Sequence, residues 1–240
     1  MPELPPPLPP HERTGGQVVA ESIRFYGSHF WAALPLGIPL AVADQASIHQ
    51  TLDVQMVVYW LLTPLFVGAY LWAIKLLHDA PPTRTAVLVA VLIWAPFPAL
   101  RAFYILPAVG WLAFIGLAVP AAAIERLGFR DALERGRRLG TADYVHALGS
   151  LAALVVVVGL SEAVLNALLH SQGGNSQRVG LFLSGLVLSP LLYLGGALLY
   201  VDQAARVGSP RQSRRSRRDA DLHPSDDAEP AGHPDPQVEP

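Results

Sequence analysis

Long apolar runs separated by short charged stretches make up most of the chain. Together these runs contain only two charged side chains, Arg101 and Glu162, and they cover residues 30–43, 54–74, 86–124, 147–169 and 179–201. Several of them reach the ~20 apolar residues that an α-helix needs to cross about 30 Å of hydrocarbon. The pattern predicts an all-α fold: a polytopic transmembrane helical bundle of about six spans, with one cytoplasmic interfacial amphipathic helix and disordered tails.

The runs differ in how clearly each one predicts a single crossing. Residues 54–74, 147–169 and 179–201 are each long enough for one span. The 39 residues of 86–124 predict a hairpin of two short helices that turns near Arg101, and the pattern leaves open whether 86–105 spans fully.

The weakest run is 30–43, with only 14 residues and both Pro35 and Pro39 inside it. It is either a crossing, if it begins at Phe25, or a re-entrant segment.

Composition divides the chain into three parts. Residues 1–15 are Pro-rich and are predicted to be a disordered N-terminal tail. Residues 16–207 form the transmembrane helical domain. Residues 208–240 hold Pro, Ser, Asp and Arg with little to bury, so they predict a disordered cytoplasmic tail that is basic and then acidic.

Basic residues are distributed unequally between the two predicted sides of the membrane. With six spans, the two tails and the loops near Lys75 and at 125–145 carry 15 of the 17 basic residues. Only Arg101 and Arg178 fall on the other side. Cytoplasmic loops are enriched in Lys and Arg, so both termini are predicted to be cytoplasmic.

Overall composition adds the class of cell and excludes some chemistry. Hydrophobic residues make up 52% of the chain and charged residues 15%, and the mean hydropathy is +0.35. The chain has no cysteine, which excludes disulfides and thiolate metal sites. Arginine outnumbers lysine 16 to 1, as in GC-rich bacterial genomes. We expect a multi-pass protein of the bacterial cytoplasmic (inner) membrane whose first apolar segment is an uncleaved anchor.

The loop between the fourth and fifth spans has helical amphipathic periodicity. Phe129, Ala132, Leu133, Gly136 and Leu139 fall on one face at 100° per residue. The charged face carries five arginines that are candidate contacts for anionic lipid headgroups: Arg126, Arg130, Arg135, Arg137 and Arg138. The helix is either an ordinary basic connector or a site for anionic lipid or a partner protein.

The same segment resembles a known family. The order of Pro120, Glu125, Gly128, Ala132-Leu133 and Arg138-Leu139 ahead of a new span is similar to bacterial six-span membrane proteins of the YciC-like type. It is also similar to the membrane domain of glycerophosphoryl diester phosphodiesterases. The resemblance implies a six-span membrane fold; no phosphodiesterase domain follows, so that activity is not implied. Gly136 stands where such proteins commonly have Ser.

Glu162 is the most unusual residue for chemistry. It lies in an otherwise apolar run, with Asn166 one turn further along the same face. Intramembrane charges usually face the interior of the bundle and often mark function. Glu162, Asn166 and Arg101 therefore form the candidate polar site: either a structural ion pair or hydrogen bond, or a proton or substrate site.

Other chemical signals are weak. Motifs of metalloproteases, phosphate-binding loops and nucleophile elbows do not occur, and we predict no catalytic residues, no metal and no cofactor. Asp44, His49 and Asp53 share the first outer loop and provide only a remote cation site. We expect membrane lipids as partners and no nucleic acid; the sequence does not identify protein partners.

Three classes of function follow, in order. The first is a non-enzymatic membrane scaffold that organises lipids or partner proteins, and the second is a small transporter that uses Glu162. An embedded enzyme ranks third, because no nucleophile and base occur together. A transporter requires a polar cavity that reaches Glu162, whereas a scaffold predicts a sealed, Leu-packed interior.

Overall fold

Helices form every regular element in the described part of the chain. The computed structural model describes residues 10–103, 105–169 and 174–208. Their elements in chain order are η1 (Pro10–Glu12), α1 (Gly15–Ser28), α2 (Phe30–Ala33), η2 (Leu34–Gly37), α3 (Ile38–Ser47), α4 (Leu52–His78), α5 (Arg84–Trp94), α6 (Phe97–Phe103), α7 (Ile105–Ile115), α8 (Ala118–Ile124), α9 (Phe129–Ala142), α10 (Tyr144–Leu169), α11 (Gly174–Leu188) and α12 (Pro190–Gly208). The predicted all-α class is confirmed.

Five helical segments are long and apolar enough to cross a membrane. They are Leu52–His78, Arg84–Arg101, Ile105–Ile124, Tyr144–Leu169 and Arg178–Gly208. These segments confirm five of the six predicted spans and divide 86–124 into the two arms of a hairpin.

The remaining candidate span, 30–43, is a chain of short pieces. It is divided among α2, η2 and α3, with Pro35 at the start of η2 and Pro39 at the start of α3. Proline has no N–H to donate and fixes its own φ, so each one favours the beginning of a new helical piece over the interior of a long one.

Prolines also divide two of the longer segments. α5 ends at Trp94 and α6 begins at Phe97, which confirms the break predicted at Pro96 and Pro98. The run 179–201 was predicted to be one helix, but α11 stops at Leu188 and α12 starts at Pro190. Pro190 cannot donate to a preceding turn, and it is well suited to the first position of a helix.

A close backbone contact holds this break in place. A Cβ on Gly37 would lie 1.9 Å from the Leu186 carbonyl oxygen, so only glycine allows η2 to approach α11 this closely. Ser189 donates a hydrogen bond to the Gly37 carbonyl (3.3 Å) and another to the Gly185 carbonyl (2.6 Å). The N-terminal pieces therefore pack against the α11–α12 junction.

The long helix α4 has the end signals expected from its sequence. It begins after Thr51, which has an extended backbone, and Asp53 lies in its first turn. Lys75 and His78 lie in its last turn, and Asp79 ends it with a left-handed conformation (φ 49°). Acidic residues near the N-terminus and basic residues near the C-terminus both complement the helix dipole.

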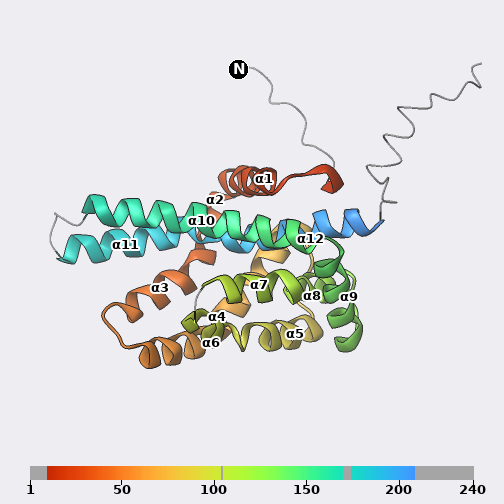
Figure 1. The fold of residues 1–240 in the computed structure, drawn as a ribbon, viewed down its shortest axis with the longest axis horizontal. Coiled ribbons are helices and arrows are strands. Elements are labelled where there is room, and N and C mark those ends of the chain that lie inside the picture. Colours follow the sequence, from red (N-terminus) through yellow and green to blue (C-terminus); the bar gives the residue numbers. More distant parts are fainter. Residues whose placement is uncertain (1–9, 104, 170–173, 209–240) are drawn as a thin grey trace, which may run out of the picture. The chain divides into compact units, whose positions relative to one another are not determined.

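The helices form layers, with one helix across the end of the bundle. α10, α11 and α12 run lengthwise beside α7, α4 and α5, whereas α9 stands across the end where α8 finishes and α10 begins (Figure 1). The core between the layers consists of side chains that are at most 1% exposed: Leu36, Ile74, Val89, Ile93, Val119 and Leu194.

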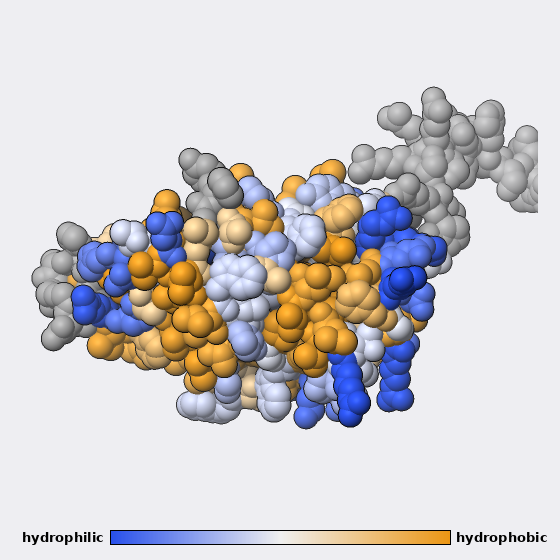
Figure 2. Space-filling view, turned by 90° about the horizontal axis from the view of Figure 1, so that it is seen from below, coloured by the Kyte–Doolittle hydropathy of each residue, from blue (hydrophilic) through white to orange (hydrophobic). Residues whose placement is uncertain are grey.

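The outer surface is as apolar as the core. Leu61, Leu88, Leu160 and Leu168 are each more than 60% exposed. Figure 2 shows a broad hydrophobic region with hydrophilic residues gathered toward the ends. Exposed apolar surface of this extent marks a surface that is covered by another phase or partner. Together with the five long apolar segments, it fits a protein embedded in a membrane.

Ordered contacts begin inside the predicted N-terminal tail. The structure describes Pro10 onward, and Pro10–Glu12 forms a 3-10 turn. Arg13 then binds Asp202 of α12 (3.3 Å). Of the predicted tails, residues 1–9 and 209–240 lie outside the described residues.

Candidate functional site

Charged side chains from three helices meet inside the bundle. Asp44 of α3 pairs with Arg101 of α6, with 3.3 Å between Oδ1 and Nη2. Tyr59 of α4 donates a hydrogen bond to the same Asp44 oxygen (2.5 Å), and the Arg101 guanidinium lies over the Tyr59 ring, 4.1 Å from its centroid. Arg101 is therefore held by an ion pair and by an aromatic face at once.

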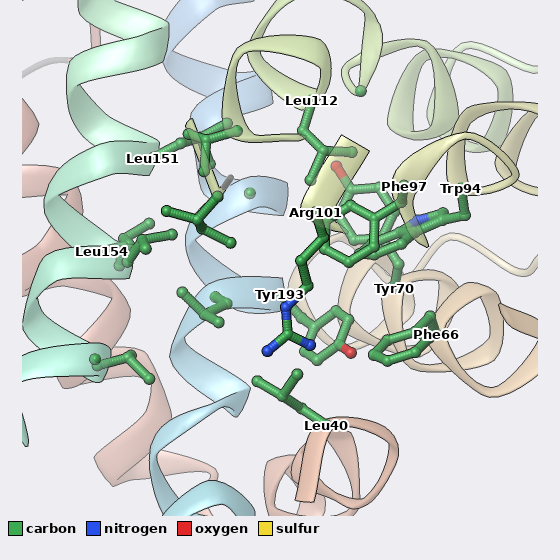
Figure 3. A pocket seen from close by; sticks show the side chains of 18 of the residues that line it. Leu40, Phe66, Tyr70, Trp94, Phe97, Arg101, Leu112, Leu151, Leu154 and Tyr193 are labelled. Atoms are coloured by element: carbon green, nitrogen blue, oxygen red, sulfur yellow. The ribbon is translucent and has the colours of Figure 1, made fainter. Parts of the chain in front are cut away.

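These charges lie at one end of a cavity. The cavity has a volume of about 380 Å³ and is bounded by α3, α4, α5, α6, α7, α10 and α12. Figure 3 shows the Arg101 side chain directed into it, with Tyr193, Leu40 and Phe66 nearby. Asp44 and Glu162 are its other charged lining residues.

A second cavity adjoins the same three charges. It measures about 260 Å³ and lies toward α11, where Gln45, Phe182 and Ser184 line it. Asp44, Arg101 and Glu162 line both cavities. The charged residues thus stand between an apolar compartment and a more polar one.

Aromatic rings form one wall of the larger cavity. Phe66 stacks on Trp94 with centroids 5.6 Å apart, and Phe97 lies 4.9 Å from Trp94. Tyr193 of α12 completes the group at 6.2 Å from Trp94. Leu151, Leu154 and Val158 of α10 face this wall from the other side. Such a cavity, largely apolar with a few polar groups at one end, is typical of small-molecule sites.

Glu162 lies beside this cluster without joining its ion pair. In the described residues, no Lys, Arg or His nitrogen lies within 4.0 Å of its carboxylate, and its buried Oε1 has no hydrogen-bond partner. Arg101, its expected partner, is bonded to Asp44. Asn166 lies one turn further along α10 and lines neither cavity. The structure therefore brings Glu162 and Arg101 to the same two cavities and leaves Asn166 outside them.

Asp44 was the residue missed by sequence reasoning. It was placed in a solvated loop with His49 and Asp53, but it lies in α3 with its carboxylate bonded to two other helices. Among the described residues, no three His, Asp or Glu side chains are placed to hold a metal ion. The signal that could have identified Asp44 is its position directly after an apolar run, where one more helical turn keeps it inside the bundle.

The arginines of the α8–α9 region separate into bonded and free groups. Arg135 pairs with Glu125 (2.9 Å), which also accepts a hydrogen bond from Tyr200 (2.5 Å). Arg138 pairs with Glu134 one turn away (2.5 Å). The other three have no ion-pair partner in the described residues and are exposed: Arg126, Arg130 and Arg137.

The apolar face predicted for this segment is buried, but by protein. Ala132, Gly136, Leu139 and Gly140 of α9 are buried against neighbouring helices, among them α7 and α8. Phe129, at the start of the helix, is 41% exposed.

A second polar cluster, which sequence reasoning missed, lies near the end of α12. The Asp202 side chain is only 1% exposed and accepts a bond from Arg13. Arg206 pairs with Asp143 (2.9 Å) and donates to the backbone carbonyl of Arg13 (2.6 Å). Asp202 falls at the polar end of an apolar run, where a charged residue ordinarily marks the end of a span, so nothing in the local pattern indicated burial.

Comparison with known proteins gives no relative for this arrangement. No protein-family model, curated protein or solved structure matches the chain.

Proposed function

We propose that this protein is a small membrane transporter that binds an amphipathic solute in the cavity beside Glu162. The observation that carries the proposal is the cavity of about 380 Å³ that reaches Glu162, Arg101 and Asp44 and adjoins a second cavity at the same residues. A scaffold has no use for such a space, because packed side chains stabilise a bundle better than a void does.

The position of the charges supports transport in particular. Asp44, Arg101 and Glu162 separate two compartments, so a solute that moves from one to the other has to pass them. Intramembrane charges that line cavities commonly mark substrate or proton pathways in transporters. The apolar lining suits the body of a solute, and the charged end suits its polar group.

A sixth crossing completes the topology of the proposed transporter. Trp72 of α4 donates to the Ala32 carbonyl (3.2 Å) and Tyr59 of the same helix donates to Asp44. The segment from Ala32 to Asp44 therefore follows α4 over 72 − 59 = 13 residues, about 20 Å at about 1.5 Å per residue. α1 continues from there toward Arg13, which binds the C-terminal end of α12.

Both termini then lie on the same side, and the charge distribution indicates which side. The end of the bundle that carries α9 and its arginines corresponds to the basic side predicted from the sequence. By the excess of basic residues on cytoplasmic loops, that end faces the cytoplasm of a bacterial cell membrane. Membership of the YciC-like group, proposed from residues 120–139, agrees with this topology.

Thiol labelling tests whether the cavity is open to water. The chain has no cysteine, so single replacements give an unambiguous signal. Gly159→Cys places a thiol on the cavity, where a Cβ meets nothing within 4 Å. Leu160→Cys is the matched control, since Leu160 is 63% exposed on the outer face of the same helix. A thiol in hydrocarbon stays protonated and unreactive.

The expected result is fast reaction of Gly159→Cys and slow reaction of Leu160→Cys with a charged, membrane-impermeant methanethiosulfonate reagent. A transporter should label from both sides of the membrane, in intact cells and in inverted vesicles. Equal, slow labelling at both positions would mean a sealed interior and would leave the scaffold as the function.

The scaffold remains the second candidate because of α9. Three exposed arginines without ion-pair partners in the described residues form a basic surface suited to anionic lipid headgroups: Arg126, Arg130 and Arg137. Each arginine near an anionic leaflet contributes about 1 kcal/mol. A protein that only organises lipids would use this surface and have no need for the cavity.

A further inference from the structure

The unbalanced charge at the cavity is negative. Arg101 is bonded to Asp44, so the charges of this pair offset each other. Glu162 has no such partner in the described residues, and its Oε1 is buried without a hydrogen bond. Two carboxylates and one guanidinium leave a formal charge of −1 on the cavity.

A donor on Arg101 also lacks a partner. Its Nη1 is buried without a hydrogen bond. An anionic solute there would gain that donor, but it would bring a third negative charge next to Asp44 and Glu162. A cationic solute would instead offset the charge of Glu162. The charges therefore favour a cation over an anion, because an uncompensated charge at low dielectric is costly.

The opposite wall of the cavity is suited to a cation as well. Phe66, Tyr70, Trp94, Phe97 and Tyr193 line it, and the faces of aromatic rings attract positive charge when water is excluded. Figure 3 shows these five rings grouped on one side of the cavity. Arg101 already uses an aromatic face in this way, at Tyr59. Leucines and valines of α10 provide contacts for an apolar body.

We propose that the solute of this cavity is a lipophilic organic cation, with its positive centre at Glu162 and its apolar body between the aromatic wall and α10. This inference rests on the proposed function and adds the charge and polarity of the solute. The cavity volume of about 380 Å³ is within the range of about 300–1,000 Å³ of small-molecule sites.

Two probes of the same shape and opposite charge test the inference. Tetraphenylphosphonium and tetraphenylborate differ in the sign of their charge and have no hydrogen-bonding groups. Equilibrium dialysis of the purified full chain in a neutral detergent measures the binding of each probe above that of protein-free micelles. The phosphonium should bind at least tenfold more tightly than the borate.

Glu162→Gln should weaken phosphonium binding at least tenfold, since the substitution removes the charge and keeps the shape. Asp53→Asn is the matched control: it removes an exposed carboxylate from the first turn of α4, outside both cavities, and should change binding less than twofold. Gly159→Leu, which obstructs the cavity without a clash at Cβ, should weaken phosphonium binding without changing any charge.

The outcomes separate this inference from the proposed function. Tighter binding of the borate, sensitive to Gly159→Leu, would overturn the cationic solute and retain the cavity as a binding site. Binding of neither probe, or equal loss of binding in Glu162→Gln and Asp53→Asn, would also overturn it. The thiol-labelling experiment decides the proposed function independently. If Glu162→Gln does not fold, the comparison of the two probes on the unmodified chain still tests the charge preference.

Discussion

Gly136 of α9 packs directly on Ala118 of α8: a Cβ at position 136 would lie 2.4 Å from the Ala118 Cβ and 2.5 Å from its Cα. By itself, a glycine in a helix costs about 1 kcal/mol relative to alanine. The contact explains why this cost is tolerated, since only glycine lets the two helices approach this closely. The Ser that YciC-like proteins commonly have at this position would not fit here without a shift of α9.

Gly136→Ala should therefore destabilise the protein, although alanine favours the helix. Overpacking in a close contact costs about 1–3 kcal/mol. The control is Gly149→Ala in α10, where a Cβ meets nothing within 4 Å. Thermal unfolding in detergent should show a lower Tm for the first variant and an equal or higher Tm for the second. A higher Tm for Gly136→Ala would mean that α9 can move away at no cost.

A double-mutant cycle should find that Arg101 is coupled to Asp44. Arg101→Gln and Asp44→Asn should each lower the free energy of unfolding, and the double variant should lose less than the sum. The side chains are 33% and 40% exposed, so we expect a coupling of about 1 kcal/mol, as for solvent-accessible pairs.

The same cycle with Glu162→Gln tests the originally expected pair. Glu162 lines the same cavities but is not bonded to Arg101, so its coupling should be smaller than that of Asp44. Equal coupling of Arg101 to both carboxylates would contradict the arrangement seen here.

Asp202→Asn should release the N-terminal segment from α12. The Asp202 carboxylate is almost fully buried, and its loss would leave the Arg13 guanidinium without its partner on α12. Loss of one member of a buried ion pair costs about 3–5 kcal/mol. Limited trypsin digestion should cleave after Arg13 or Arg24 faster in this variant than in the unmodified protein. Asp53→Asn should be cleaved at the rate of the unmodified chain.

Topology reporters should find both termini in the cytoplasm. A C-terminal fusion should be active only as a cytoplasmic reporter, and so should an N-terminal one, because Arg13 lies at the same end of the bundle as Asp202 and Arg206. A tag at Gly173, which lies outside the described residues, should be accessible only from outside. Termini on opposite sides would mean that α2, η2 and α3 do not complete a crossing.

Anionic lipid should stabilise the protein through the free arginines of α9. Addition of phosphatidylglycerol to detergent-solubilised protein should raise its Tm more than phosphatidylcholine does. Arg137→Gln should remove part of that difference, about 1 kcal/mol. The adjacent Arg138→Gln is the control, since its guanidinium is already bonded to Glu134 (2.5 Å). Equal effects of the two substitutions would indicate a response to net charge alone.

Properties that depend on neighbours along the chain could be derived from the sequence. The length of each apolar run determines whether a helix can cross a membrane, and five spans were predicted correctly on that basis. Pro96 and Pro98 marked the break between α5 and α6, because a missing N–H acts within one turn. Arg101 and Glu162 could be identified because a charge within an apolar run is costly wherever the run is placed.

Only the tertiary structure decided which residues meet. Asp44 lies 57 residues before Arg101 on a different helix, and helical periodicity describes the faces of one helix at a time. The buried pair of Arg13 and Asp202 spans 189 residues, and Asp202 has the same local pattern as an ordinary residue at the end of a span. The packing of Gly136 on Ala118 likewise depends on the distance between two helices. The sequence thus determined where charges are costly, and the packing of the helices determined which charges offset one another.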